Sequence, residues 1–519
     1  MHQSQQNHLL GHGRSAEGKG NVKVGNERDS VRFDICGSFL PSTFNLHLHM
    51  LSPEISFWIM LTVSLGFAGW FGWQHGKKYA LGAGLAASLL AGTWFDITVL
   101  NTRINVTMAT AIVLLVVYCT HSWREIFRHL GLLDYLIGAI TIWHIIVDTY
   151  HGEQPLAVAA QAYGQWMLPY AAGRYAFLHR NSLLKLGPVF AIAGAIISLL
   201  CVAEACSGTN IWETAFAPRD ELVNFNGRVR YGIAYRACGP TRHAIFLSNM
   251  LLTLIPFAIL MTQREINWFP KLGKRNRLPG LAIVAILTAG IASSLSRGPL
   301  ITLYVAGCLS IAWLYRPAAW TLLGASLIAA ILVAANWNEF IRLIESNEQD
   351  RKRASVLVVD DEDEAIIYTG TRNRLVILQV YVPIFLEGGP LGYGTTASTG
   401  FPPKDLPGLP TAPKVRKRLG IVDNAFLNNG LRFGWVGLVL FAGLFVLATS
   451  TALHLARRAS TYFFPLDQRY FIAVAMLSIA FLFEIATVFW SYDYATWMLL
   501  GFGTVSGLLS QVKRPDFAV

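Results

Sequence analysis

The chain has 519 residues, of which 53% are hydrophobic and only 14% are charged. A soluble globular protein carries roughly 25% charged residues, so the composition excludes that class and indicates a membrane protein. The net charge of +11 would suit a nucleic-acid partner, but no basic helix or aromatic stacking surface is recognisable, and we expect no nucleic-acid binding.

Residues 1–50 differ from the rest of the chain because they are polar and rich in His, Gly and Ser. They contain no long apolar region of the kind found in a signal peptide. Met50 stands directly before the first apolar run. We therefore expect either a disordered N-terminal extension or a start codon assigned too early.

Apolar runs long enough to cross a bilayer then recur to the C-terminus, which predicts an all-α polytopic membrane protein with about 12 or 13 transmembrane helices. A closed barrel is excluded because these runs are continuous and do not alternate. The fifth run is the weakest and could instead be re-entrant. The predicted spans cover residues 54–73, 79–99, 104–120, 131–149, 156–173, 184–203, 242–262, 280–296, 299–315, 319–336, 434–454, 470–490 and 495–511.

Short basic connections between the spans predict the orientation of the chain. Basic residues gather in alternate connections, which places those connections in the cytoplasm. Two long connections, residues 204–241 and 337–433, then face outward. The basic groups are Lys77 with Lys78, Arg124 with Arg128, Arg174 with Arg180 and Lys185, the segment 263–277, Arg316, Arg457 with Arg458, and Lys513 with Arg514.

The first long connection ends in an arginine-rich segment, "RVRYGIAYRACGPTRHAIFLSNML", residues 228–251. Its Arg236, Arg242 and His243 stand just before a span. Lipid head groups or acidic groups in the same connection would explain these arginines. A bulky anion would explain them equally well, because guanidinium binds phosphate through two donors and keeps its charge.

Two cysteines, Cys206 and Cys238, fall in the same outward connection. An oxidising compartment would permit a disulfide between them. Two unpaired thiols are the alternative, and we expect that alternative.

Two further arginine groups follow along the chain. "SLSRG" (294–298) predicts a tight outward turn in which Arg297 is either a structural anchor or part of a site. Arg372 and Arg374 begin "TRNRLVILQVYVPIFLEGGPLGYG" (371–394), which predicts an amphipathic helix against the membrane and a solvated glycine-rich turn. The glycines lack the Lys–Ser/Thr of a Walker phosphate loop.

Acidic side chains occur in two other settings. The run "VVDDEDEAIIY" (358–368) lacks the spacing of a calcium loop and predicts a solvated linker. Asp134, Asp148 and Glu484 lie within predicted spans, where they could line a transport path. They are few, unmatched and mostly near span ends, which argues against that path.

An Asp–Asn pair opens the stretch "DNAFLNNGLRFGWVGLVLF" (423–441), just before a long apolar run. Asp423 or Asn424 could cap the helix, and Asp423 could also pair with Arg432. A carboxylate in a dry mouth could instead accept a proton as a general base. The stretch by itself favours the cap.

Taken in order, "RACGPTRHAIFL", "SLSRG", "TRNRL…GGPLGYG" and "DNAFLNNGLRFGWVGLVLF" resemble the O-antigen ligase and O-antigen polymerase superfamily, over roughly residues 204–454. Members are polytopic glycosyltransferases of bacterial envelopes with a GT-C type fold. The resemblance implies that a glycan moves, with inversion, from a polyprenyl diphosphate carrier to a hydroxyl of a glycan or lipid acceptor. It implies the outer face of the inner membrane as the place of reaction, with no cofactor or metal. The resembling core would lie between N-terminal helices, residues 51–203, and C-terminal helices with a short tail, residues 455–519.

The resemblance also implies roles for particular residues. Arginines of this kind hold the diphosphate, which indicates Arg236, Arg242, Arg297, Arg372 and Arg374. We count Arg297 among the catalytic residues and add His243 and Arg432 to the residues expected to bind the substrate. Many members carry a His where this chain has Asp423. We expect Asp423 to act as the base with help from Asn424, or else only to orient sugar hydroxyls.

Several functions stay open from the sequence. Polymerase and ligase share their donor chemistry and cannot be separated by it. A secondary transporter of an anionic lipid or glycan would require charges near the bilayer midplane and two related halves, and neither is recognisable. An inactive scaffold of an export complex would follow if Asp423 cannot replace the usual His.

Overall fold

The structure is a computed structural model of the chain, which divides into two units, Met1–His47 and Leu48–Val519. The first unit, and with it the predicted N-terminal extension, lies outside the described residues. The structure describes residues 52–92, 95–99, 102–126, 129–179, 181–215, 229–230, 234–263, 277–336, 356–358, 365–367, 370–395, 422–462 and 468–512.

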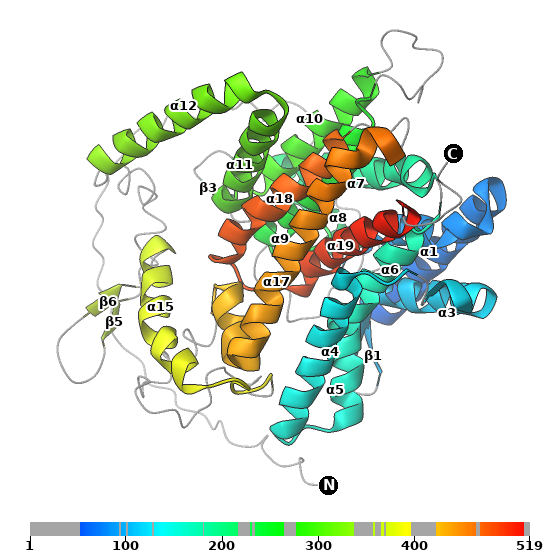
Figure 1. Cartoon of the computed structure of the whole chain (residues 1–519), viewed down its shortest axis with the longest axis horizontal. Coiled ribbons are helices and arrows are strands. Elements are labelled where there is room, and N and C mark those ends of the chain that lie inside the picture. Colours follow the sequence, from blue (N-terminus) through cyan, green and yellow to red (C-terminus); the bar gives the residue numbers. More distant parts are fainter. Residues whose placement is uncertain are drawn as a thin grey trace, which may run out of the picture. The chain divides into compact units, whose positions relative to one another are not determined.

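The part of the second unit up to residue 260 is built from helices and two short antiparallel hairpins (Figure 1). In the first hairpin Asp96 pairs with Asn105. The elements are α1 (Pro53–His75), η1 (Lys77–Tyr79), α2 (Ala80–Ser88), β1 (Asp96–Val99), β2 (Thr102–Asn105), α3 (Val106–Ile126), α4 (Leu132–Tyr150), α5 (Pro155–Ala162), η2 (Tyr163–Met167), α6 (Leu168–Ala176), α7 (Ser182–Ser207), α8 (Ile211–Ala215), β3 (Val229–Arg230), β4 (Ala234–Tyr235) and α9 (Ala244–Leu260).

The later part adds helices that pack on these and a third small hairpin. Helix α17 packs on α4 and α18, α18 also packs on α11, and α19 packs on α6 and α9. The elements are α10 (Leu278–Ser293), α11 (Arg297–Leu314), α12 (Arg316–Ala335), β5 (Val356–Val358), β6 (Ala365–Ile367), α15 (Gly370–Glu387), α17 (Ala425–Tyr462), α18 (Arg469–Ile485) and α19 (Tyr492–Val512).

Each predicted span contains a helix of the structure, and the all-α polytopic class is confirmed. Five helices of the described chain, α1, α4, α7, α11 and α17, are long and apolar enough to cross a membrane individually. Helices α3, α9 and α10 contain shorter apolar stretches. The helix expected at the start of 371–394 is also present, as α15.

The second predicted span, residues 79–99, is wrong at its C-terminal end. Helix α2 stops at Ser88 after 9 residues, a length of about 13 Å at 1.5 Å per residue. The chain then turns at Gly92, which has a left-handed φ of 59°. A Cβ atom on Gly92 would lie 1.9 Å from the carbonyl oxygen of Pro240. The close approach of a distant segment therefore ends the helix and leaves residues 96–99 to form β1.

The fifth predicted span is helical throughout, because α5, η2 and α6 follow one another without a turn. The middle piece, η2, is a π-helix, a rare geometry that widens one helical turn. It carries the buried Trp166, whose ring stacks on Trp490 with centroids 6.2 Å apart. This segment is a continuous helix and not a re-entrant loop.

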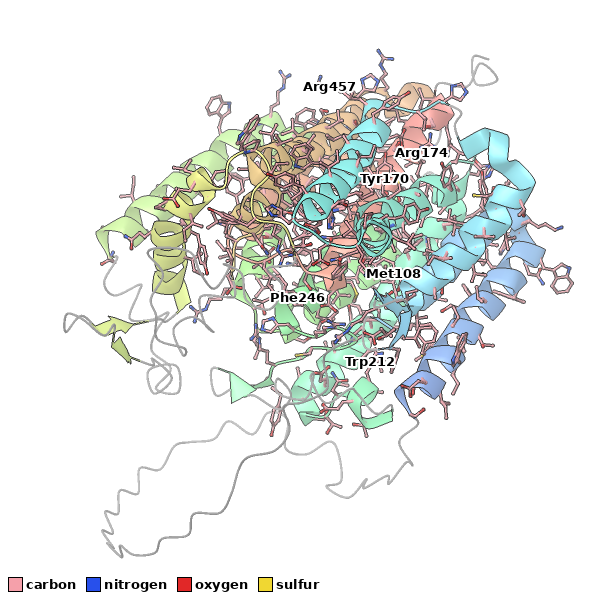
Figure 2. The ribbon with its side chains drawn as sticks, turned by 90° about the horizontal axis from the view of Figure 1, so that it is seen from below. Met108, Tyr170, Arg174, Trp212, Phe246 and Arg457 are labelled. Carbon is pink, nitrogen blue, oxygen red and sulfur yellow. The ribbon has the colours of Figure 1, made fainter. Side chains whose placement is uncertain are left out.

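Arg174, expected in a basic connection between spans, lies instead within a helix. Arg174 lies in α6, is only 2% exposed, and its Nε lies 2.8 Å from Oδ1 of Asp134. Tyr170 donates to the same carboxylate oxygen at 2.7 Å. Figure 2 shows Tyr170 and Arg174 among the packed helices. Asp134, expected to be unmatched, thus belongs to a buried network that joins α4 to α6.

Candidate functional site

Arg236 lies in the segment 236–243, which leads into α9 and which we call the arginine loop. Its Nε donates to the carbonyl oxygen of Ser294 at 3.2 Å, and its Nη2 donates to Oγ of Ser296 at 3.0 Å. Ser294 and Ser296 belong to the turn between α10 and α11. These bonds therefore fix the arginine loop to the turn that carries Arg297.

Arg242 is placed between two buried carboxylates. Its Nη2 lies 3.6 Å from Oδ2 of Asp96 in β1, and its backbone N–H donates to Oδ1 of Asp493 in α19 at 3.4 Å. The Nε of Arg242 is buried and forms no hydrogen bond with any described residue. Arg242 therefore keeps one desolvated donor that the surrounding fold does not use.

His243 is the N-cap of α9, because its Nδ1 accepts a hydrogen bond from the N–H of Ile245 at 3.2 Å. An Nδ1 that accepts must be unprotonated, which assigns the ring proton to Nε2 when the ring is neutral. The ring also contacts Phe246, with centroids 5.3 Å apart. The geometry thus gives His243 a structural role at the end of the arginine loop.

Arg297 is the first residue of α11, and the tight turn expected before it is present. Leu295 has a left-handed φ of 50°, and Ser296 is the N-cap residue. A Cβ atom on Gly298 would lie 3.3 Å from Oε1 of Glu484, which is 3% exposed on α18. The start of α11 therefore lies against a buried carboxyl group.

Residues 388–395, which we call the glycine clasp, hold a kink in α17. The N–H groups of Tyr393 and Gly394 donate to the carbonyl oxygens of Leu431 and Arg432, both at 2.8 Å. The kink lies at Gly434, whose φ of 67° and ψ of −172° are not helical. The expectation of a solvated turn for these glycines is wrong, because they pack against a membrane helix.

Only glycine fits at the kink. A Cβ atom on Gly434 would lie 2.0 Å from the carbonyl oxygen of Pro390, and one on Gly392 would lie 2.4 Å from the nitrogen of Gly434. The N–H of Trp435 donates to the carbonyl oxygen of Gly389 at 3.2 Å. The glycine clasp thus forms hydrogen bonds with backbone groups that have no helical partner at the kink. It also determines the position of Arg432, two residues before Gly434.

The end of the clasp is anchored to α4 by a buried polar chain that the sequence did not reveal. Thr395 donates from its backbone N–H to Oδ1 of Asp148 at 2.8 Å, and its hydroxyl contacts Oδ2. His144 Nε2 lies 3.0 Å from the same Oδ2, and Trp166 donates to His144 Nδ1 at 3.2 Å. Asp148 is therefore matched inside the protein.

Tyr492, at the start of α19, lies within electrostatic range of both Arg432 and Arg242. Tyr492 interacts electrostatically with both guanidinium groups, and its hydroxyl donates to Oε1 of Gln165 at 3.3 Å. It is 42% exposed, so the cluster reaches the surface. The Nε of Arg432 is buried and, like that of Arg242, has no hydrogen-bond acceptor within the described part of the chain.

Asn424 caps α17, as the sequence favoured for this pair. Its Oδ1 accepts a hydrogen bond from the N–H of Leu427 at 2.9 Å, and its side chain is largely buried. Asp423 precedes the cap and is half-buried. The two neighbours therefore differ: Asn424 caps the helix, and Asp423 lies just before its N-terminus.

Other predicted residues fall partly or wholly outside the description. Arg372 and Arg374 lie at the start of α15, but their side chains are outside the described residues. The acidic residues 360–364 are also outside them. Cys206 is exposed, Cys238 is buried, and no disulfide joins the two.

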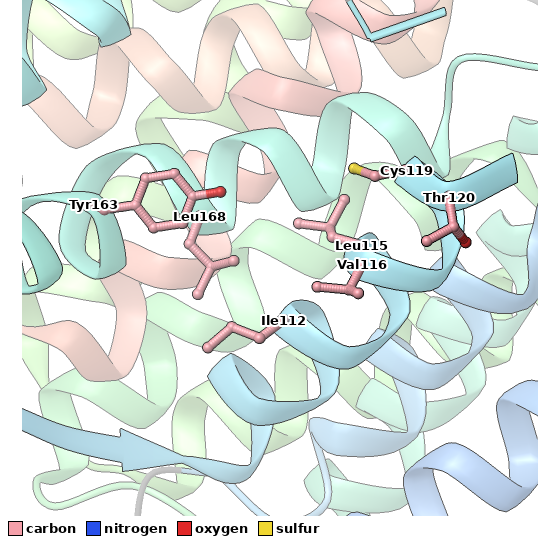
Figure 3. A pocket seen from close by; sticks show the side chains of 7 residues that line it. All are labelled: Ile112, Leu115, Val116, Cys119, Thr120, Tyr163 and Leu168. Atoms are coloured by element: carbon pink, nitrogen blue, oxygen red, sulfur yellow. The ribbon is translucent and has the colours of Figure 1, made fainter. Parts of the chain in front are cut away.

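An apolar cavity of about 500 Å³ opens between α3 and the η2–α6 segment (Figure 3). None of the predicted site residues lines it. The lining residues are Ile112, Leu115, Val116, Cys119, Thr120, Tyr163 and Leu168.

The geometry therefore joins arginines from three distant segments. Arg242 and Arg432 both act electrostatically on Tyr492, and Arg236 is bonded to the turn of Arg297. Buried donors are almost always satisfied in folded proteins, and the Nε groups of Arg242 and Arg432 have no acceptor among the described residues. Guanidinium favours anions with several oxygens, above all phosphates.

Residues 282–442 match the family model described as O-Antigen ligase, and this confirms the resemblance indicated by the motifs. The matched range includes Arg297, Asp423 and Arg432. No curated protein matches the chain.

Proposed function

We propose a specific reaction for this chain. Residues 282–442 match the O-antigen ligase family model, and this match supports a multi-pass bacterial membrane protein of the glycan ligase or polymerase kind. It moves a glycan from a polyprenyl diphosphate carrier to an acceptor hydroxyl. The reaction takes place at the outer face of the inner membrane and inverts the anomeric carbon.

The observation that carries this proposal is the pair of unused guanidinium donors. The Nε groups of Arg242 and Arg432 are buried and lack an acceptor among the described residues, and both guanidinium groups interact with Tyr492. As the glycosidic bond breaks, negative charge develops on the departing diphosphate. Fixed donors in a site that excludes water stabilise this negative charge more strongly than they stabilise the substrate before the bond breaks. This difference lowers the activation barrier.

Arg236 and Arg297 support the same role from the other side of the arginine loop. Arg236 already donates to Ser294 and Ser296, so we assign it mainly to the shape of the binding site. Arg297, on the first turn of α11, is proposed to contact the diphosphate directly. Arg372 and Arg374 remain proposed as further ligands of the donor.

Activation of the acceptor is assigned to Asp423. Its carboxylate, at the mouth of α17, would accept the proton of the attacking hydroxyl, or would only orient that hydroxyl while another group takes the proton. Asn424 uses its Oδ1 as a helix cap, which leaves its amide N–H groups to donate to a sugar. His243 is proposed as a further helper through the nitrogen that does not cap α9.

The test uses purified protein in detergent, an isolated polyprenyl-diphosphate oligosaccharide and an acceptor glycan, with product glycans measured by mass spectrometry. We expect Arg242→Ala, Arg432→Ala and Arg297→Ala each to lower turnover by about 100- to 1,000-fold, as loss of a charge-stabilising donor does. Asp423→Asn should lose turnover to a similar degree if Asp423 is the base, and less if it only orients the acceptor.

Lys77→Ala is the control, because Lys77 is exposed in η1 and has no proposed role. Wild-type turnover in all four site variants would refute the assignment of the site. Movement of the lipid-linked glycan across vesicles without any new product would support a transporter instead. A ladder of lengthened products indicates a polymerase, and one transfer to a different acceptor indicates a ligase.

A further inference from the structure

We infer that Glu204 is a positioning residue for the arginine loop, an inference that rests on the proposed function. Glu204 lies near the C-terminal end of α7 and is 4% exposed. It comes from a part of the chain that precedes the family match, and the motifs of the sequence did not single it out.

The carboxylate of Glu204 is bound by three N–H donors. Its Oε1 accepts from the backbone N–H of Cys238 at 2.9 Å and from Nδ2 of Asn210 at 3.1 Å. Its Oε2 accepts from the backbone N–H of Gly239 at 2.9 Å. One side chain therefore bonds two consecutive backbone N–H groups and fixes the middle of the arginine loop.

The backbone at this point forms an anion-binding nest. The consecutive N–H groups of Cys238 and Gly239 both donate to the Glu204 side chain, and Gly239 has a left-handed φ of 54°. A Cβ atom on Gly239 would lie 2.6 Å from Sγ of Cys201, so glycine is required for space as well. The Glu204 side chain occupies the position at which this backbone would bind an anion. A substrate anion would therefore be bound by the side chains of Arg236 and Arg242.

The fixed nest is coupled to the arginines through a short, hydrogen-bonded turn. Arg236 stands two residues before Cys238, and Arg242 stands three residues after Gly239. Thr241 bridges the interval, since its hydroxyl donates to the carbonyl oxygens of Cys238 at 2.8 Å and His243 at 3.0 Å. A change in the position of Cys238 and Gly239 would therefore also move the guanidinium groups of Arg236 and Arg242.

Glu204→Gln should disturb this arrangement without changing the size of the side chain. An amide has one acceptor oxygen, so its NH₂ group would face one of the two backbone donors and push the loop away. Misplacement of a binding group by 1 Å can cost on the order of 100-fold in rate, and we expect kcat/KM for the lipid-linked donor to fall roughly 100-fold. Glu213→Gln, in the neighbouring α8, is the matched control and should keep the wild-type value.

A double-mutant cycle separates positioning from general loss of stability. Glu204→Gln is combined with Arg242→Lys, on the loop, and separately with Arg432→Lys, on α17. If Glu204 acts through Arg242, the first double variant loses less than the product of its two single losses. The second double variant should lose close to the full product, because the glycine clasp and not Glu204 presents Arg432.

Should Glu204→Gln fail to fold, as judged by size-exclusion chromatography in detergent, Asn210→Ala takes its place in the same cycle. It removes the Nδ2 bonds to Glu204 and to the carbonyl oxygen of Gly239, together with the cap of α8, and should give a smaller loss with the same coupling to Arg242. Wild-type kcat/KM in these variants, or equal coupling to both arginines, overturns the inference alone. Wild-type kinetics in Arg242→Lys and Arg432→Lys, or no transfer by the unaltered protein, instead overturns the proposed function beneath it.

Discussion

Arginine is used in two different ways at two places in this molecule. In α6, Arg174 is 2% exposed and its charge is matched by Asp134 at 2.8 Å, with further donation to the carbonyl oxygen of His129 at 3.4 Å. At the start of α9 and at the kink of α17, Arg242 and Arg432 keep buried Nε donors unused by the described fold. The first arrangement stabilises helix packing, and the second is what a ligand site requires.

Burial and charge alone do not identify a binding arginine. All three side chains lie in or beside predicted membrane spans, and the sequence assigned Arg174 to a loop. What separates them is the neighbour of the Nε atom. That of Arg174 lies 2.8 Å from a carboxylate oxygen, whereas those of Arg242 and Arg432 have no hydrogen-bond acceptor among the described residues.

The largest expected effect is on stability, at Arg174. Arg174→Ala leaves the Asp134 carboxylate buried without its cation, which costs about 3–5 kcal/mol of unfolding free energy. Thermal unfolding of the purified protein in detergent would measure the loss. The double variant Arg174→Met with Asp134→Leu should recover most of it, because neither charge is then buried alone. An unchanged unfolding midpoint in Arg174→Ala would contradict the structural role of Arg174 and its contrast with Arg242 and Arg432.

Arg432→Ala should show the opposite pattern. We expect its transition-state stabilisation to fall by about 2.7–4 kcal/mol, measured as kcat/KM for glycan transfer. Its unfolding midpoint should change little, by the equivalent of about 1 kcal/mol or less, since the Nε of Arg432 serves no described acceptor. A large loss of stability with unchanged kinetics per folded molecule would place Arg432 in the class of Arg174.

Gly434→Ala tests whether the kink presents Arg432. The left-handed φ of 67° alone makes alanine unfavourable by about 1–3 kcal/mol, and the Cβ atom would collide with Pro390. Stability and transfer activity should therefore fall together. Gly443→Ala is the control in the same helix, because a Cβ atom there would meet only Leu136 at 3.8 Å.

Asn424→Ala should cost about 1 kcal/mol of stability, the usual effect of losing an N-cap. Asn424→Ser keeps a capping oxygen and should restore that loss in a thermal melt. If Asn424→Ser also transfers glycan at the wild-type rate, the amide has no role toward the substrate, and the proposed helper function is wrong.

The smallest expected effect is chemical and concerns Cys238 under the arginine loop. Burial, together with the nearby Glu204, raises the pKa of Cys238 to about 12. A raised pKa keeps the thiol protonated from neutral pH up to values near that pKa, and the thiolate is the reactive form. Between pH 7 and 9, a maleimide should label the exposed Cys206 and spare Cys238, as read by peptide mass spectrometry. Labelling of Cys238 in this range would show that the loop opens.

Much of the fold follows from apolar runs, because a helix of about 20 apolar residues is what a bilayer selects. The misjudged features depend on contacts between distant segments. Helix α2 ends early because Gly92 meets Pro240, and Arg174 is buried because Asp134 lies on another helix. Neither contact leaves a local pattern in the sequence.

The same reasoning applies to the site. Arginine-rich segments and an Asp–Asn pair are visible in sequence, so Arg242, Arg432 and Asn424 could be named. Tyr492 and Gln165 could not, since each is an ordinary residue in an apolar segment until the fold joins them by a hydrogen bond, with Arg432 acting electrostatically on Tyr492. The glycines of "GGPLGYG" predicted a turn, but their contact with α17 becomes clear only from the kink at Gly434.

The glycine clasp has a consequence for how this protein can diversify. Residue 395 is fixed to α4, residue 424 caps α17, and the 26 residues of segment 396–421 connect the two anchored ends. Lengthening a loop whose ends are already fixed costs little, about 0.6 kcal/mol for each doubling. Insertions or exchanges in this segment could therefore accumulate during evolution, or be introduced by engineering, without moving Arg432 or Asp423.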